Sequence, residues 1–309
     1  MKKSTHTSRR STVKISAQVQ QYLLASLSDN TRLAYGNDIE HFLKWGGRIP
    51  SSPEHVASYL AEHANKLTYA TLSRRVIAIG RAHTAKGIQS PAHSEIVRAT
   101  LHGIRRTYGS AQRRVSPALL QDVRKMVSGL EGIKGVRDKA LLLIGFAGAF
   151  RRSELVGLQV EDIQFVKKGM IIRIRRGKTD QVGKGRDIAI PLVYGKLSPV
   201  AAVKEWLQQS GINDGCVFRR VDRNGKVANG GLSPQSVALI VKQRAKQIGL
   251  DERQYSGHSL RAGLVTSAAN SGVSSWKICQ QTGHQSAAMM QRYIRGSRLF
   301  VDNPLGKIG

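Results

Sequence analysis

One stretch of this 309-residue chain has the alternation of apolar and polar side chains that half-buried β-strands require. It comprises residues 162–166, 170–175 and 186–192, separated by a Lys-Lys-Gly turn at 167–169 and a glycine-rich turn at 179–185. This spacing predicts a three-stranded antiparallel meander. Elsewhere the apolar periodicity is helical, so we expect a mainly α protein with a small antiparallel β-sheet, an α+β fold.

The first third of the chain carries the signals of four helices. A serine or threonine that can cap a helix, in two cases followed by proline, stands at Ser28, Ser52, Thr68 and Ser90. After the first cap, one helical face gathers Tyr35, Ile39, Phe42 and Leu43. Four helices of this size predict a small helical bundle over residues 16–106.

A basic segment without apolar periodicity follows the predicted bundle. Arginines flank it at Arg105, Arg106, Arg113 and Arg114. We place an interdomain linker at 107–116, with residues 1–15 as a flexible basic arm, 117–296 as a second domain and 297–309 as a tail. A linker this basic is expected to lie along a polyanion, and a solvated run of charge is the alternative.

The charge of the chain indicates what it binds. Lys and Arg total 49 against 20 Asp and Glu, a formal net charge of +29. Residues 1–116 carry +12 and residues 117–309 carry +17, so both halves are basic. That distribution favours a protein that holds a long polyanionic polymer over a globular domain with one basic tail.

Cysteine content and hydropathy exclude other classes of protein. Cys216 and Cys279 are far apart and belong to no Cys/His cluster, so we expect no disulfide framework, no metal site and no cofactor. No run of about 18 apolar residues or signal-peptide core is present in the sequence, so we expect neither membrane association nor secretion. The expected location is the cytoplasm.

Two clusters in the second domain could bind an anion. An apolar run ends in Arg151, with Glu154 three residues on, which could present a guanidinium to a phosphate or form a structural ion pair. His258 and Arg261 share a helical face at an expected helix N-terminus, a favourable place for phosphate. Taken alone, a His-x-x-Arg pair is more often structural.

Two further clusters are basic or aromatic. The predicted hairpin offers Lys178 and Lys184, although hairpin lysines are usually just solvated. His284 follows a glycine, and Tyr293 stands nine residues later between two arginines, a favourable setting for a phenol that must lose its proton. The segment 275–292 could alternatively be a helix-turn-helix.

Together, in this order and spacing, these motifs resemble the tyrosine recombinase (phage integrase) family. The resemblance covers residues 117–295 as the catalytic domain, and the helical first third is similar to the family's core-binding (SAM-like) domain. It implies that Tyr293 attacks a DNA phosphate and forms a 3′-phosphotyrosyl link, without ATP or metal. It also implies that Arg151 and Arg261 hold the non-bridging oxygens of that phosphate.

The remaining site residues take their roles from the same resemblance. Lys178 would be the general acid, and Lys184 is the less expected candidate. His258 would assist as a base or orienting donor, His284 would donate to a phosphate oxygen, and Glu154 would brace the arginine or histidine.

The resemblance also implies partners and assembly. The expected substrate is double-stranded DNA with a specific core site, bound partly through Arg105, Arg106, Arg113, Arg114 and Lys184. Free protein would be monomeric or weakly associated, and a homotetramer would act on two sites through a Holliday junction. The apolar residues of the tail, Leu299, Phe300 and Val301, would dock on a neighbouring subunit, and no arm-binding domain is expected before Tyr35.

The recombination could serve integration, excision or resolution. Two other functions are alternatives to recombination. A type IB topoisomerase would use the same covalent chemistry as a monomer. A non-enzymatic helix-turn-helix DNA-binding protein would keep the charge but would have no use for Arg151, His258 and Arg261.

Overall fold

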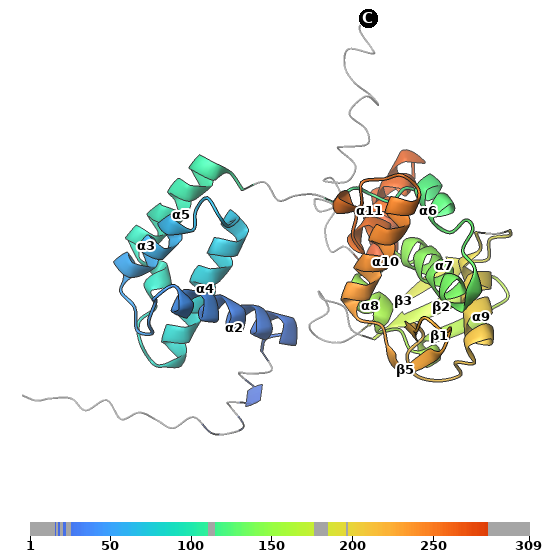
Figure 1. Cartoon of the computed structure of the whole chain (residues 1–309), viewed down its shortest axis with the longest axis horizontal. Helices are drawn as coiled ribbons and strands as arrows, with labels where there is room; N and C mark the ends of the chain where they lie inside the picture. Colours follow the sequence, from blue (N-terminus) through green and yellow to red (C-terminus); the bar gives the residue numbers. More distant parts are fainter. Residues whose placement is uncertain are drawn as a thin grey trace, which may run out of the picture. The chain divides into compact units, whose positions relative to one another are not determined.

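The computed structural model describes residues 26–110, 115–175, 185–195 and 197–283, together with positions 16, 18, 21 and 22. The chain divides into two compact units, Met1–Arg113 and Arg114–Gly309. In Figure 1 the first unit runs from blue to teal and the second from green to red.

The first unit is helical. Its elements are α2 (Asp29–Lys44), α3 (Pro53–Glu62), α4 (Tyr69–Ala85), the 3-10 turn η1 (Pro91–His93) and α5 (Glu95–Tyr108). Ser28, Ser52 and Thr68 cap α2, α3 and α4 as predicted, each accepting a backbone N–H three residues on. Ser90 caps only the short turn η1, and α5 begins separately at Glu95. The predicted start of the fourth helix at Ser90 was therefore wrong. The cause is Ser94, whose ψ of 150° breaks the helical path.

The core of the first unit lies between two helix pairs. Helix α2 packs against α4, and α3 packs against α5; Figure 1 shows α2 crossing α4. Fully buried side chains in this core include Phe42, Tyr59, Leu60, Leu72 and Ile79. Burial of each of these side chains stabilises the folded unit by about 2 kcal/mol.

The second unit combines helices with short strands. Its helices are α6 (Leu120–Met126), α7 (Gly132–Ala147), α8 (Arg152–Val156), α9 (Pro199–Ser210), α10 (Pro234–Gln247), α11 (His258–Asn270) and α12 (Ser275–Thr282), with 3-10 turns η2 (Val160–Asp162) and η3 (Glu252–Gln254). Its strands are β1 (Ile163–Val166), β2 (Gly169–Ile174), β3 (Arg186–Pro191), β4 (Arg219–Val221) and β5 (Val227–Gly231). None of the helices in the described ranges combines the length and apolar character needed to cross a membrane.

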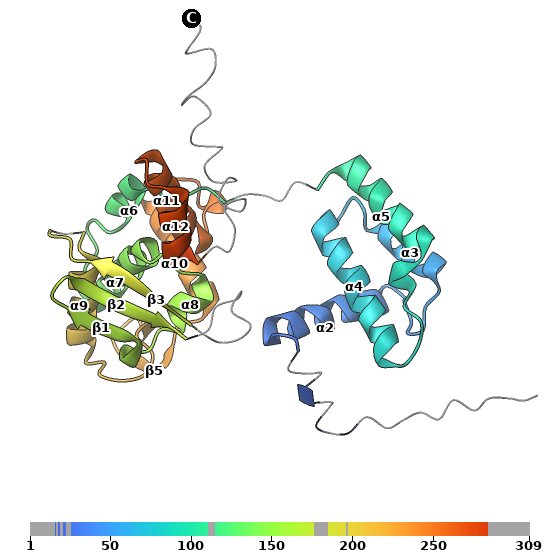
Figure 2. The same ribbon diagram turned by 180° about the vertical axis from the view of Figure 1, so that it is seen from behind.

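The predicted meander is confirmed. Strands β1, β2 and β3 form an antiparallel sheet in that order, visible in Figure 2 with β2 in the middle. Met170 pairs with Ile190, and Ile172 pairs with Ile188, which places buried side chains on one face of the sheet. The alternation in the sequence therefore marks the face that packs on the core.

A second, two-stranded sheet was not predicted. Strands β4 and β5 pair antiparallel around a turn in which the Asp222 carboxylate accepts the backbone N–H groups of Asn224 and Lys226. Strand β4 has three residues, and β5 ends in Asn-Gly-Gly. Neither has enough alternation or β-propensity to be recognised in the sequence, so tertiary packing must fix this hairpin.

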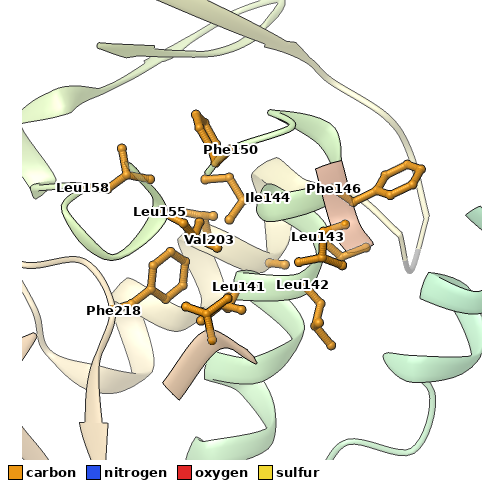
Figure 3. Packing of buried hydrophobic residues seen from close by; sticks show 14 of the residues in the cluster. Leu141, Leu142, Leu143, Ile144, Phe146, Phe150, Leu155, Leu158, Val203 and Phe218 are labelled. Carbon is orange, nitrogen blue, oxygen red and sulfur yellow. The ribbon is translucent and has the colours of Figure 1, made fainter. Parts of the chain in front are cut away.

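Helix α7 lies at the centre of the second unit. Leu141, Leu142 and Ile144 have no exposed surface. Figure 3 shows the side chains of α7 gathered with Leu155 of α8, Val203 of α9 and other apolar residues. Because the second half of α7, residues 140–147, carries only apolar side chains and glycine, its position is fixed by packing, and so is the chain that follows its C-terminal end.

The chain before α6 is tied closely to α11. The Ala118 N–H donates to the Ser259 carbonyl oxygen over 2.9 Å. A Cβ at Gly263 would overlap the Ala118 carbonyl, so only glycine permits this approach. The contact holds the N-terminal turn of α11, where His258 and Arg261 lie, against the start of the unit.

Candidate active site

The turn between α7 and α8 presents Arg151. Helix α7 ends at Ala147, and Ala149 then adopts a left-handed conformation with φ +48°. That conformation costs a residue with a Cβ about 1 kcal/mol or more, so the surroundings must hold it. They do so in part through Arg261, whose Nη1 donates to the Ala149 carbonyl oxygen over 2.7 Å. Arg151 is therefore placed by a turn that α11 fixes.

Arg151 is paired with Glu154. Its backbone N–H donates to Glu154 Oε2 over 2.9 Å, and its Nη1 donates to Oε1 over 2.6 Å. The Glu154 side chain is 2% exposed and that of Arg151 is 19% exposed. The ion pair considered as an alternative therefore exists. It does not exclude an anion-binding role, because a guanidinium has five N–H donors and this one reaches the surface.

Helix α11 supplies a buried arginine and a histidine with a lowered pKa. Arg261 is 1% exposed. His258 is exposed as a residue, but desolvation by the chain around it lowers its pKa below the ordinary value of 6.5, and the positive charges of Arg261 and Arg151 lower it further. Arg152 acts in the same direction. His258 is therefore neutral near pH 7 and able to accept a hydrogen bond or a proton.

Arg186 belongs to this site but was not predicted. At the start of β3, its Nη2 lies 3.3 Å from Glu154 Oε2, and its Nη1 donates to the Gln281 carbonyl oxygen over 3.0 Å. Burial lowers the pKa of Arg186, with Arg151 acting in the same direction and Glu154 opposing it. In the sequence Arg186 is the last member of the basic run 175–186, and nothing local distinguishes it from the other basic residues of that run.

The structure brings together part of the predicted site. Arg151, Glu154, His258 and Arg261 are close enough to share hydrogen bonds or charge effects. The other predicted catalytic residues lie outside the described residues: Lys178, His284 and Tyr293. The same holds for three predicted DNA contacts: Arg113, Arg114 and Lys184, the last of which is also the alternative general acid.

The remaining predicted DNA contacts lie on α5. Arg105 and Arg106 are exposed in its last turn. The Arg105 guanidinium also lies over the ring of Tyr69, 5.7 Å from its centroid. In the ranges that the structure covers, no group of three or more His, Cys, Asp or Glu side chains is placed to hold a metal ion.

Comparison with known proteins identifies the class to which this fold and site belong. Residues 117–298 match the phage integrase family. That match spans more than half of the chain, and the chain belongs to this family of site-specific DNA recombinases. These similarities support neither the topoisomerase nor the non-enzymatic alternative.

One relative covers nearly the whole chain, and another covers about half of it. It is 40% identical to an integrase/recombinase XerD homolog of Selenomonas ruminantium, over 96% of this chain and 90% of the relative. The tyrosine recombinase XerA of Pyrococcus horikoshii is 30% identical over 56% of this chain and 54% of its own length. A lambda integrase dimer bound to a COC′ core site has a similar fold, with a TM-score of 0.60 and 18% identity over 90% of this chain and 93% of that one.

Proposed function

We propose that this recombinase cuts and rejoins double-stranded DNA through a covalent 3′-phosphotyrosyl link to Tyr293. The observation that carries the proposal is the convergence of α8 and α11. Arg261 hydrogen-bonds to the turn that presents Arg151, and the charges of both arginines lower the pKa of His258. Two fixed guanidinium groups beside a neutral imidazole suit a phosphate that gains charge in its transition state.

In the proposed reaction the Tyr293 oxygen attacks the phosphorus and the 5′-oxygen leaves. Arg151 and Arg261 stabilise the non-bridging oxygens, and Lys178 gives a proton to the leaving oxygen, with Lys184 as the alternative acid. One phosphate ester replaces another, so its free energy is kept and the strand can be rejoined without ATP. Neutral His258 would accept or orient the tyrosine proton.

The remaining proposed roles concern His284 and Glu154. His284 would donate a hydrogen bond to a phosphate oxygen. Glu154, whose buried carboxylate accepts hydrogen bonds from Arg151, would hold that guanidinium in place.

The proposed substrate is duplex DNA with a core site. Arg105 and Arg106, together with the basic segment 107–116 and its arginines, would contact the phosphates. Each phosphate contact should contribute about −0.9 to the slope of log affinity against log salt. In the cell the protein would act in the bacterial cytoplasm, on the nucleoid or on a mobile element.

We further propose a tetramer on two DNA sites, joined by the tail at 297–309. Its apolar residues Leu299, Phe300 and Val301 would dock on the next subunit. Deletion of 297–309 should abolish cooperative assembly and spare binding to a single site. Unchanged assembly of the truncated protein would contradict this role.

The function is tested with two labelled DNA molecules that carry the sequence selected by the protein from its own genomic DNA. A recombinase yields a four-way junction and then two exchanged products. Relaxation of supercoiled DNA without junctions or exchange would instead identify a topoisomerase, and binding alone would identify a DNA-binding protein without catalysis.

A further inference from the structure

The carboxylate of Glu154 lies between two arginines that come from different elements. Oε1 accepts from Arg151 Nη1 over 2.6 Å, and Oε2 lies 3.3 Å from Arg186 Nη2. The Glu154 side chain is 2% exposed. Burial of a carboxylate is costly unless charged or hydrogen-bonding partners compensate it, so Arg186 is part of what keeps Glu154, and hence Arg151, in one orientation.

The other end of the Arg186 guanidinium reaches α12. Its Nη1 donates to the Gln281 carbonyl oxygen over 3.0 Å, close to the C-terminal end of that helix. The Gln281 side chain in turn donates to the Ala147 carbonyl oxygen over 3.0 Å, at the end of α7. Arg186 thus joins α8, β3 and α12 in one set of hydrogen bonds, and the Gln281 side chain links this set to α7.

Gly283 completes this junction. It ends α12 in a left-handed conformation with φ +67°, and a Cβ there would lie 2.9 Å from Arg186 Nε. Only glycine combines that conformation with the close approach of the arginine. His284 is the next residue in the chain, so the segment carrying His284 and Tyr293 starts from a point that Arg186 contacts.

We propose that Arg186 is a positioning residue for DNA cleavage. Through Glu154 it orients Arg151, and through the Gln281 carbonyl it fixes where the chain departs toward His284 and Tyr293. This inference rests on the proposed function, because it assumes that Arg151 and Tyr293 act on the same phosphate. In this proposal Arg186 acts through the two internal acceptors to which Nη1 and Nη2 donate, and its role is distinguished from phosphate binding by the salt dependence below.

Substitution of Arg186 should distinguish a positioning role in cleavage from a role in binding the phosphate. A lysine has one ammonium group and cannot hold Glu154 and the Gln281 carbonyl in the fixed geometry of a guanidinium fork. Displacement of catalytic groups by about 1 Å lowers rates by about a hundredfold. We therefore expect Arg186→Lys to slow cleavage at least about tenfold and Arg186→Gln about a hundredfold. Single-site affinity and its salt slope should stay unchanged.

The experiment measures single-turnover cleavage of a nicked suicide duplex that carries the selected site, with thermal unfolding measured in parallel. Arg173→Gln is the matched control. Arg173 also lies in the meander and pairs with a carboxylate, Asp187 at 3.0 Å, but both side chains are at least half exposed. The control should cleave at the wild-type rate. A double variant, Arg186→Lys with Glu154→Gln, should be less slow than the product of the two single effects, because each single variant already disturbs the contact that the two residues share.

Three outcomes would overturn this inference and leave the proposed function standing. Cleavage by Arg186→Lys at the wild-type rate would show that the fork is not needed, even if Arg186→Gln fails to fold. A salt slope reduced by about 0.9 would make Arg186 a phosphate ligand. Wild-type protein and the Arg186 variant can also be compared at temperatures equally far below their own unfolding midpoints. If they then cleave at the same rate, Arg186 contributes only to stability. Absence of any covalent product with wild-type protein would refute the proposed function itself, and this inference with it.

Discussion

Arg261 donates a hydrogen bond over 2.7 Å to the carbonyl oxygen of Ala149, 112 positions earlier in the chain. The acceptor lies in the left-handed turn that directly precedes Phe150 and Arg151. A buried guanidinium thus has a structural partner on one nitrogen, while the same helix turn carries His258. Arg261 therefore helps to hold the turn that presents Arg151, the other arginine assigned to the phosphate.

Arg261→Lys should lower the rate of DNA cleavage by about 10²- to 10³-fold, the usual effect of losing a transition-state donor. Affinity for a single site should change little, because many phosphate contacts hold the duplex. Single-turnover cleavage and equilibrium binding measure the two quantities. The control is Arg253→Lys, whose side chain is 77% exposed and pairs with Asp251. Equal losses of affinity and rate for Arg261→Lys would show that it acts in binding.

Glu154→Gln should destabilise the second unit by about 3 kcal/mol, because it leaves two arginines around a neutral amide in a buried position. The measurement is urea unfolding, with the free energy extrapolated to water. Asp187→Asn removes an exposed partner of Arg173 and should cost less than about 1 kcal/mol. Similar losses for both variants would mean that the buried carboxylate contributes no more than a surface ion pair.

His258 should titrate below 6.5 in the free protein, because desolvation by the surrounding chain and then the charges of Arg261 and Arg151 lower its pKa. Arg151→Gln removes one of these charges and should raise the pKa, whereas Arg253→Gln should not. An NMR titration, assigned with His258→Gln, measures both shifts. A midpoint at or above 6.5 in wild-type protein would contradict the described environment.

The same lowered pKa has a consequence for stability. Below pH 6.5 the unfolded chain takes up a proton at His258 that the folded protein does not. The stability contribution of neutral His258 is therefore complete above that pH and is lost as the pH falls below it. The His258→Gln variant should lose less stability than wild type between pH 7 and pH 5.

Gly263→Ala should destabilise the second unit by several kcal/mol, because the added methyl group overlaps the Ala118 carbonyl. Gly103→Ala is the matched change in a helix with open space around it, and it should stabilise the first unit by about 0.5–1 kcal/mol. Thermal unfolding of each variant tests the pair. A tolerated Gly263→Ala would mean that α11 does not need its close approach to the preceding chain.

The predictable part of the fold is the part with strong local signals. The meander follows from alternation over several residues, and α2, α3 and α4 follow from Ser28, Ser52 and Thr68 acting as caps. The hairpin of β4 and β5 has too few residues to carry such a pattern. Its pairing therefore depends on tertiary contacts rather than on a local pattern.

The same distinction applies to the candidate site. Arg151, His258 and Arg261 stand in short motifs whose order and spacing are visible in the sequence. Arg186 was missed because its partners, Glu154 and Gln281, are 32 and 95 positions away. In a basic segment, long-range geometry alone distinguishes a buried, paired arginine from a solvated one.

The most direct test of the proposed chemistry is the covalent product. The protein is incubated with nicked suicide duplexes that carry its selected site, quenched in detergent and resolved by gel, with Tyr293→Phe in parallel. We predict a protein–DNA adduct, joined through the DNA 3′-phosphate, that is absent with Tyr293→Phe. An adduct that persists in Tyr293→Phe would contradict the assignment of the nucleophile, and tight, salt-sensitive binding without any adduct would contradict catalysis by strand cleavage.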